Sequence, residues 1–288
     1  MIKAPFLLRH SAQIYDEAKR HAMLDEIFLV LLGFGAGTVG SLVGLGGGIV
    51  IAPVLTFLGL PPAAAASSSL MGAFGNIGAA TLTHTLKRRI RYQLGLKLGL
   101  IATPGTVLGA WLAGVVEPSA FKILFGVALL AVCAYILIRS KMKARSMEET
   151  ILVMIVAAVS SFSAGVVSSF FGIGGGIVFV PLMMLVMGMT MKDGAAAAQP
   201  ALLVIVAAGI ISHGVLGHLD VGYSILLLIG GFCGGLLGTR ISHGLNEMHL
   251  RVIVSVLITA AAVRLFWEAL DEAYRGGLFL YGLPGITN

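Results

Sequence analysis

Long stretches without a charged side chain dominate the hydrophobic pattern of this chain. The first runs from Ile27 to Leu86, 60 residues without Asp, Glu, Lys or Arg, and would be about 90 Å long as a helix. The hydrocarbon core of a bilayer is about 30 Å thick, so this stretch must cross or re-enter a membrane several times. Further charge-free stretches are Leu98–Val116, Ile123–Ile138, Ile151–Met191, Gly194–Leu219, Val221–Thr239 and Val252–Val263. The pattern predicts an all-α polytopic membrane protein, because these stretches do not alternate as barrel strands do.

Composition supports a membrane protein and excludes several other classes. Charged residues make up 11% of the 288 residues, against about 25% in soluble domains, and the mean hydropathy is +0.99. These values exclude a cytosolic enzyme, a disordered tail and a nucleic-acid binder. The two cysteines, Cys133 and Cys233, lie in apolar stretches, which excludes a disulfide scaffold. The pI of about 9.5 reflects basic residues in short loops, the usual sign of membrane topology.

The second half of the chain repeats the first. GLGGGIVIAP at Gly44–Pro53 matches GIGGGIVFVP at Gly172–Pro181 with an offset of 128 (172 − 44). After an insertion near residues 189–193 the offset becomes 129, which pairs His84 with His213. We therefore divide the chain into an N-terminal interfacial segment (1–26), a first membrane repeat (27–139), a basic linker (140–150), a second membrane repeat (151–268) and a C-terminal tail (269–288).

Loop charges predict that the two repeats have inverted topology. One loop of the first repeat carries Lys87, Arg88, Arg89, Arg91 and Lys97, whereas the equivalent loop of the second repeat carries only Asp220. Under the positive-inside rule these equivalent loops face opposite sides of the membrane. The basic linker is then cytoplasmic, and both termini lie on the external or periplasmic side. The alternative is a parallel duplication whose loop charges diverged by chance.

The two glycine-rich segments predict discontinuous helices. The apolar pieces that follow them, Ile49–Leu60 and Ile177–Met187, are shorter than the roughly 20 residues that a spanning helix needs. A helix that starts mid-membrane presents free backbone N–H groups and a positive dipole end, which together bind an anion. The alternative is close helix packing, which we favour for the isolated glycine pairs elsewhere. The candidate binding glycines are Gly46, Gly47, Gly48, Gly174, Gly175 and Gly176.

The doubled G-[LI]-G-G-G-I-V-x-x-P block, with an Ala/Ser-rich stretch after each copy, resembles the TauE/SafE family of sulfite exporters, also called TSUP permeases. The resemblance covers about residues 27–268. It implies a multi-pass carrier of the bacterial inner membrane for sulfite, organosulfonates or related sulfur-containing anions. The first half keeps a serine-rich stretch at Ala66–Ser69, whereas the second half has Ala198-Gln199-Pro200 at the corresponding place.

Few polar side chains lie deep in the apolar stretches, and these are the remaining site candidates. We consider Ser68, Ser69, Asn76 and Gln199 as substrate contacts, or alternatively as hydrogen bonds between helices. The three consecutive serines at 67–69 cannot all face one way on a helix, because successive residues turn by about 100°, so at most one or two of them line a given cavity. His84 and His213 are candidates for a pH-sensitive gate at opposite mouths, or alternatively cap helix ends at the interface.

These observations predict a secondary transporter for a small sulfur-containing oxyanion, working by alternating access to a site near the membrane midplane. The alternative is an anion channel or facilitator of the same architecture. We expect no enzyme activity, metal or cofactor, because the stretches contain no paired carboxylates and no His-x-x-x-His or Gly-x-Ser-x-Gly motif. The expected partners are the anion and the lipid bilayer, with a homodimer left open and no nucleic acid.

Overall fold

The structure is a computed structural model that describes residues 26–42, 44, 46–86, 92–138, 151–176, 179, 191–241, 255, 256 and 258–271. Every regular element in these ranges is a helix, as the hydrophobic pattern predicts. The linker 140–150, the basic loop residues 87–91, most of the second short apolar piece and most of both terminal segments lie outside the described residues.

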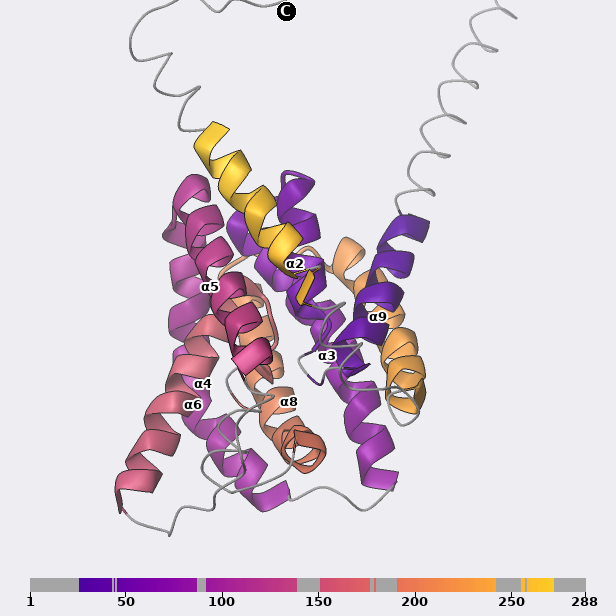
Figure 1. Ribbon diagram of the computed structural model, residues 1–288, viewed down its shortest axis with the longest axis vertical. Coiled ribbons are helices and arrows are strands. Elements are labelled where there is room, and N and C mark those ends of the chain that lie inside the picture. Colours follow the sequence, from indigo (N-terminus) through magenta and orange to yellow (C-terminus); the bar gives the residue numbers. More distant parts are fainter. Residues whose placement is uncertain are drawn as a thin grey trace, which may run out of the picture.

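The helices form an elongated bundle (Figure 1). A helix at Glu26–Leu42 comes first, and a helical segment at residues 258–271 is the last element described. Between them lie α2 (Gly48–Phe57), α3 (Pro62–Leu86), α4 (Tyr92–Val115), α5 (Pro118–Ile138), α6 (Ile151–Phe171), α8 (Met191–Val215) and α9 (Val221–Ile241).

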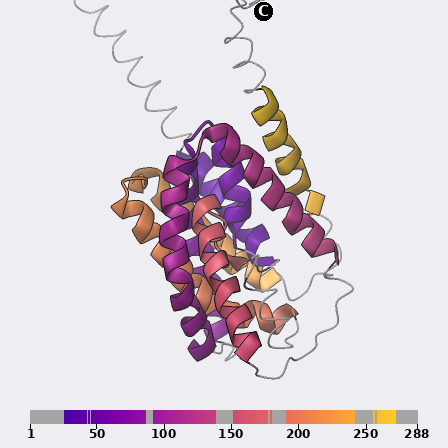
Figure 2. The same cartoon turned by 90° about the vertical axis from the view of Figure 1, so that its left-hand side faces the viewer.

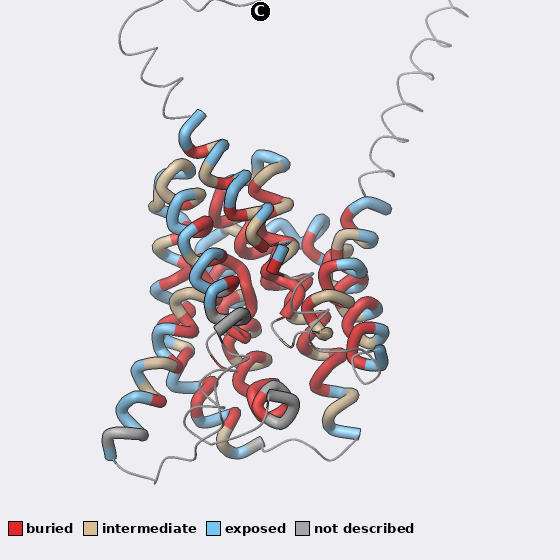
Figure 3. Tube along the Cα trace, in the orientation of Figure 1, coloured by how far each residue is buried: buried red, intermediate tan, exposed pale blue. Residues whose placement is uncertain are grey.

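The outer surface of the bundle is apolar. Large side chains such as Leu86, Met154 and Val215 are 77%, 71% and 83% exposed. Figure 3 shows exposed residues on the outward faces of the helices and buried residues on the inward faces. Such a surface is unfavourable in water and favourable in lipid. Four helical stretches in the described residues are long and apolar enough to cross a membrane: Gln93–Val115, Met154–Phe171, Ala196–Val215 and Val221–Ile241.

The first repeat opens with a helical hairpin. Its second arm, the 10-residue α2, is too short to span a bilayer, which needs about 20 residues, and its first arm is described over Glu26–Leu42. The chain reverses between them, so that a Cβ at Gly47 would lie 3.2 Å from the Ala36 carbonyl oxygen. Further along, Leu29 packs in one cluster with Leu55. The predicted discontinuity is confirmed here, and the hairpin returns toward the end of the bundle from which it came (Figure 1).

Repeat-equivalent helices make equivalent contacts. Gly105 of α4 packs directly against the Phe162 carbonyl of α6, and its counterpart Gly234 of α9 packs against the Phe34 carbonyl of Glu26–Leu42. No Cβ fits at either position, so glycine is required for the backbones to approach. The packing interpretation of the isolated glycine pairs is therefore confirmed at these crossings. Each repeat thus packs a long helix onto the opening helix of the other repeat.

The equivalent helices α3 and α8 run antiparallel through the centre. The Ser67 hydroxyl near the start of α3 donates to the His218 carbonyl just after α8, at 2.9 Å. Farther along, a Cβ at Gly209 of α8 would lie 3.0 Å from Leu70 of α3. Antiparallel equivalent helices are what an inverted repeat requires. The orientation of each half relative to a bilayer stays a prediction.

One flank is formed by α5 and residues 258–271, which lie side by side in Figures 1 and 2. Phe121 and Phe125 of α5 are fully buried in one cluster with Leu265. The Glu268 carboxylate pairs with Lys122 at 3.7 Å and with Arg264 at 3.2 Å. This flank lies beside the central helices.

Candidate functional site

The two glycine breaks have similar backbone φ angles except at one residue. Gly44 and Gly46 have φ of 72° and 87°, and their counterparts Gly172 and Gly174 have φ of 75° and 89°. These left-handed conformations suit glycine, because a Cβ would clash with the backbone. The next residue differs, since Gly47 returns to φ −69° whereas Gly175 stays left-handed at 77°.

The two breaks touch each other in the centre of the bundle. Gly48 at the start of α2 packs against the Gly172 carbonyl and against Ile173, with no room for a Cβ. A Cβ at Gly46 would lie 3.4 Å from the Ile173 carbonyl oxygen. Two predicted glycines of the first repeat, Gly46 and Gly48, therefore contact the second break at Gly172 and Ile173, directly before its predicted glycines.

Ser69 joins the breaks. Its fully buried hydroxyl lies 3.1 Å from the Gly48 carbonyl oxygen and 2.8 Å from the Gly172 carbonyl oxygen. A hydroxyl has one proton, which these two acceptors share. Ser69 therefore lies at the predicted place, but its proton is committed to the backbone.

Ser68 has a different partner from Ser69, about 100° away around the helix. Its hydroxyl accepts a hydrogen bond from Ser224 of α9 at 3.1 Å. Ser68 also lines a cavity of about 530 Å³ between α9 and the opening hairpin, with Tyr223 and several apolar side chains. Ser68 and Ser69 therefore do not share one cavity.

Asn76 links α3 to the opening helix by hydrogen bonds. Its side-chain amide donates to the Gly37 carbonyl and, at 2.7 Å, to the Ser41 hydroxyl. Both amide protons are used within the protein, and the side chain is 2% exposed. The structure thus places Asn76 at a helix crossing of the first repeat.

Gln199, His84 and His213 are the remaining polar candidates. Gln199 is 4% exposed in α8, directly before Pro200. His84 is half-buried in the last turn of α3. Since α3 and α8 are antiparallel, His84 and His213 lie at opposite ends of the bundle.

His213 pairs with a histidine that sequence reasoning missed. Its ring is fully buried, with Nε2 3.0 Å from the Ser169 carbonyl oxygen and Nδ1 3.2 Å from Nδ1 of His218. A carbonyl only accepts, so Nε2 carries the hydrogen, and Nδ1 of the neutral ring accepts from His218. The pair lies where the turn after α8 meets α6, and His218 also packs against Gly114 of α4.

Two serines at the end of α6 were also not identified from the sequence. Ser168 and Ser169 are fully buried, and within the described part of the chain their hydroxyl oxygens have no hydrogen-bond partner. The Ser168 carbonyl accepts from the Gly172 and Ile173 N–H groups at 2.9 and 3.2 Å, which ends the helix. A serine pair directly before the second break is the signal in the sequence that could have identified them.

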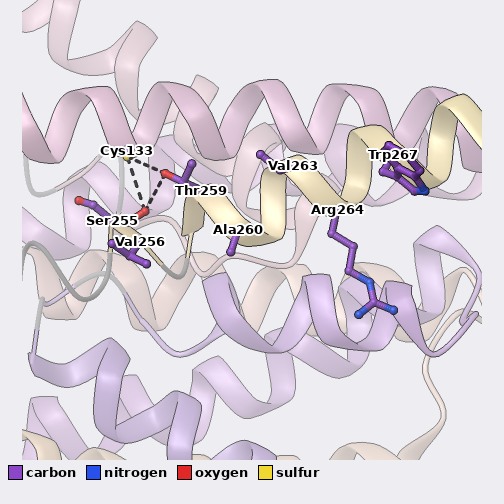
Figure 4. Close-up of a pocket in the computed structure, with 8 residues that line it drawn as sticks. All are labelled: Cys133, Ser255, Val256, Thr259, Ala260, Val263, Arg264 and Trp267. Carbon is purple, nitrogen blue, oxygen red and sulfur yellow. Dashed lines mark hydrogen bonds between the residues drawn. The ribbon is translucent and has the colours of Figure 1, made fainter.

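A larger groove lies on the outer flank of the molecule. It has a volume of about 800 Å³ and is drawn in Figure 4, where Cys133 faces Ser255 and Thr259. Trp267, 75% exposed, lines the same groove together with Arg264. No residue of either glycine break lines it, so we place the candidate site at the breaks.

These features define the class of protein. The chain is a multi-pass helical membrane protein whose opening helix is broken at mid-bundle, an architecture typical of secondary transporters. It belongs to the family described as "Sulfite exporter TauE/SafE", which matches residues 29–265.

Known relatives are similar over most of their length. The chain is 27% identical to the probable membrane transporter protein YunE of Bacillus subtilis, over 86% of this chain and 99% of the relative. It is 26% identical to a probable membrane transporter protein of Methanocaldococcus jannaschii, over 80% and 91%. A probable membrane transporter protein of Xylella fastidiosa is 27% identical, over 86% and 98%. No solved structure matches the chain.

Proposed function

We propose that the protein is a secondary transporter for a small sulfur-containing oxyanion, such as sulfite or an organosulfonate, in the bacterial cytoplasmic (inner) membrane. The observation that carries this proposal is the contact of the two glycine breaks at the centre of the bundle, at Gly48 and Gly172. The family to which the chain belongs supplies the class of substrate.

The start of α2 supports anion binding. α2 begins at Gly48 with no side-chain cap and no acidic residue in its first turn. The N–H groups and positive dipole end of such a helix attract a negative group without a lysine or arginine. Binding without a fixed positive charge also lets the anion leave readily.

Alternating access would follow from the arrangement of the repeats. The opening helix reaches the breaks from one end of the bundle and α6 from the other (Figure 1). Movement of one repeat against the other would expose the contact to each side in turn. The start of the opening helix and the end of the helical segment 258–271 lie at the same end of the bundle, at the top of Figure 1, which supports placing both on the same side of the membrane.

Flux measurements on the purified full-length chain in liposomes test the proposal. We expect saturable uptake of labelled sulfite or sulfoacetate, accelerated when the same anion is loaded inside. Single-channel currents without counterflow would identify the rival function, an anion channel. Absence of flux for the whole panel of sulfonates, sulfite and thiosulfate would refute the proposed substrate class.

A further inference from the structure

We propose that the anion binds at the second glycine break rather than symmetrically at both, with the Ser168 and Ser169 hydroxyls as its donors. This inference rests on the proposed function and names the residues that hold its substrate. It moves the site away from Ser69 and Asn76, whose protons are committed within the protein.

The two hydroxyls have no structural use in the described residues. Other helical serines donate to the carbonyl four residues earlier, as the buried Ser161 does to Ala157 at 2.7 Å and the partly buried Ser212 does to Ala208 at 2.8 Å. Ser168 and Ser169 make no such bond although both are 0% exposed. A buried hydroxyl without a partner is unfavourable, which points to a ligand that completes the site.

Both serines lie against the elements that form the second break. The Cβ of Ser168 is 3.6 Å from the position of a Cβ at Gly175, and Leu202 of α8 is 3.4 Å from the same position. The hydroxyl oxygen of Ser169 is 3.4 Å from the position of a Cβ at Gly209, also on α8. Ser168 therefore lies beside Gly175 of the second break, and the Ser169 hydroxyl lies beside α8 at Gly209.

The first break has no spare hydroxyls at the equivalent places. With the offset of 128, Ser168 corresponds to Gly40 and Ser169 to Ser41 (168 − 128 and 169 − 128). Gly40 has no side chain, and the Ser41 hydroxyl accepts from Asn76 at 2.7 Å. With the offset of 129, the counterpart of Asn76 is the apolar Ile205 (76 + 129).

The chemistry of the second break favours an anion over a cation. The carbonyl and carboxylate oxygens that a cation would use are engaged or missing near the serines, because the Ser168 carbonyl accepts two N–H groups and the Ser169 carbonyl faces His213 Nε2. The Gly172 carbonyl accepts the Ser69 hydroxyl, and α6 contains no acidic residue. Each serine hydroxyl has a free proton, which a sulfite or sulfonate oxygen accepts in a charge-assisted hydrogen bond, and also lone pairs, so sodium is the competing ligand in the test below.

Calorimetry on the purified full-length protein in detergent tests the site. Sulfite and sulfoacetate are titrated as sodium and as choline salts into the unmodified chain, Ser168→Ala, Ser169→Ala and the matched control Ser41→Ala. Hydrogen bonds to charged groups are strong enough that each of the first two changes should weaken the bound anion about tenfold or more. Ser41→Ala should change affinity less than about twofold, because its hydroxyl serves only the first repeat.

A substitution that adds an amide to the second repeat gives a second measurement of anion binding. Ile205→Asn supplies the amide that the first repeat has at Asn76, beside the second break, since Ile205 and Ser168 each lie 3.6 Å from the Cβ position of Gly175. It should abolish binding while thermal unfolding without ligand stays cooperative, which shows that the variant is folded. This variant keeps the inference testable if the serine variants unfold.

Each outcome decides between the two proposals. If the unmodified chain binds none of the anions, the proposed function fails and this inference fails with it. If it binds them and both serine variants bind equally well, the proposed function stands and the second-break site is wrong. Stabilisation by sodium regardless of the anion, lost in Ser168→Ala, would make this a cation site and overturn the inference.

Discussion

The first glycine break packs tightly on the opening helix, whereas the second lies beside two buried serine hydroxyls, Ser168 and Ser169, that have no hydrogen-bond partner in the described residues. In the first, a Cβ at Gly40 would lie 2.5 Å from the Gly47 nitrogen, so the break packs tightly on the opening helix. In the second, Ser168 takes the place of Gly40, and Gly175 departs to φ 77°. Two nearly identical glycine motifs thus adopt different structures, and the residue four positions before each motif, Gly40 or Ser168, differs in size.

The largest effect should come from forcing the two breaks apart. Gly48→Ala places a methyl group in the Gly172 carbonyl, which is backbone and cannot turn away. We expect a loss of about 4 kcal/mol or more in unfolding free energy, measured as a lower midpoint of thermal unfolding.

Gly78→Ala is the matched control for this change, because nothing lies within 4 Å of its Cβ position. It should leave the midpoint unchanged or slightly higher. A Gly48→Ala protein as stable as Gly78→Ala would show that the breaks do not touch.

Asn76→Leu should be next, with a loss of about 2–4 kcal/mol, because it leaves the buried Gly37 carbonyl without its donor. Ile205→Leu at the equivalent position of the second repeat should cost less than about 1.5 kcal/mol, since it conserves volume. Chemical unfolding of the two variants measures the difference. Equal losses of unfolding free energy would contradict our assignment of the Asn76 hydrogen bonds as a stabilising feature of the first repeat alone.

His213→Ala should cost about 2–3 kcal/mol, because it removes a buried ring and the donor to the Ser169 carbonyl. His84→Ala should cost less than about 1 kcal/mol, since His84 is only half-buried. Thermal unfolding compares the two.

Transport between about pH 5.5 and about pH 8 tests the gate hypothesis for the same histidines. We expect His213→Ala to change the pH profile, because protonating its pair with His218 requires a ring or tautomer change at the second break. A profile that neither alanine variant alters would remove the gate.

The smallest difference concerns the glycine at which the breaks diverge. Gly175→Ala should cost about 1–2 kcal/mol, because an alanine at φ 77° is strained. Gly47→Ala should cost about 1 kcal/mol or less, because its φ of −69° suits any residue. The new Cβ would lie 3.2 Å from the Ala36 carbonyl oxygen and 3.3 Å from Gly37 Cα, which need to move by only a few tenths of an ångström. Reversal of this order in thermal unfolding would contradict the backbone difference between the breaks.

The sequence predicted the helical membrane class, the duplication and the helix break at Gly44–Gly48. It also predicted that neighbouring serines such as Ser68 and Ser69 face different partners. It did not single out Ser168, Ser169 or His218. A buried hydroxyl is conspicuous only when its neighbours are known, and Ser168 reads like any serine of an apolar helix.

What the sequence determined by itself is local or additive along the chain. Hydropathy sums over about 20 neighbours, and a left-handed glycine turn depends on one residue at a time. Which polar groups remain unused was decided by the tertiary structure, because their partners lie far away in sequence. Ser69 meets Gly172 across 103 positions and Ser67 meets His218 across 151, and such hydrogen bonds exist only once the two halves have packed together.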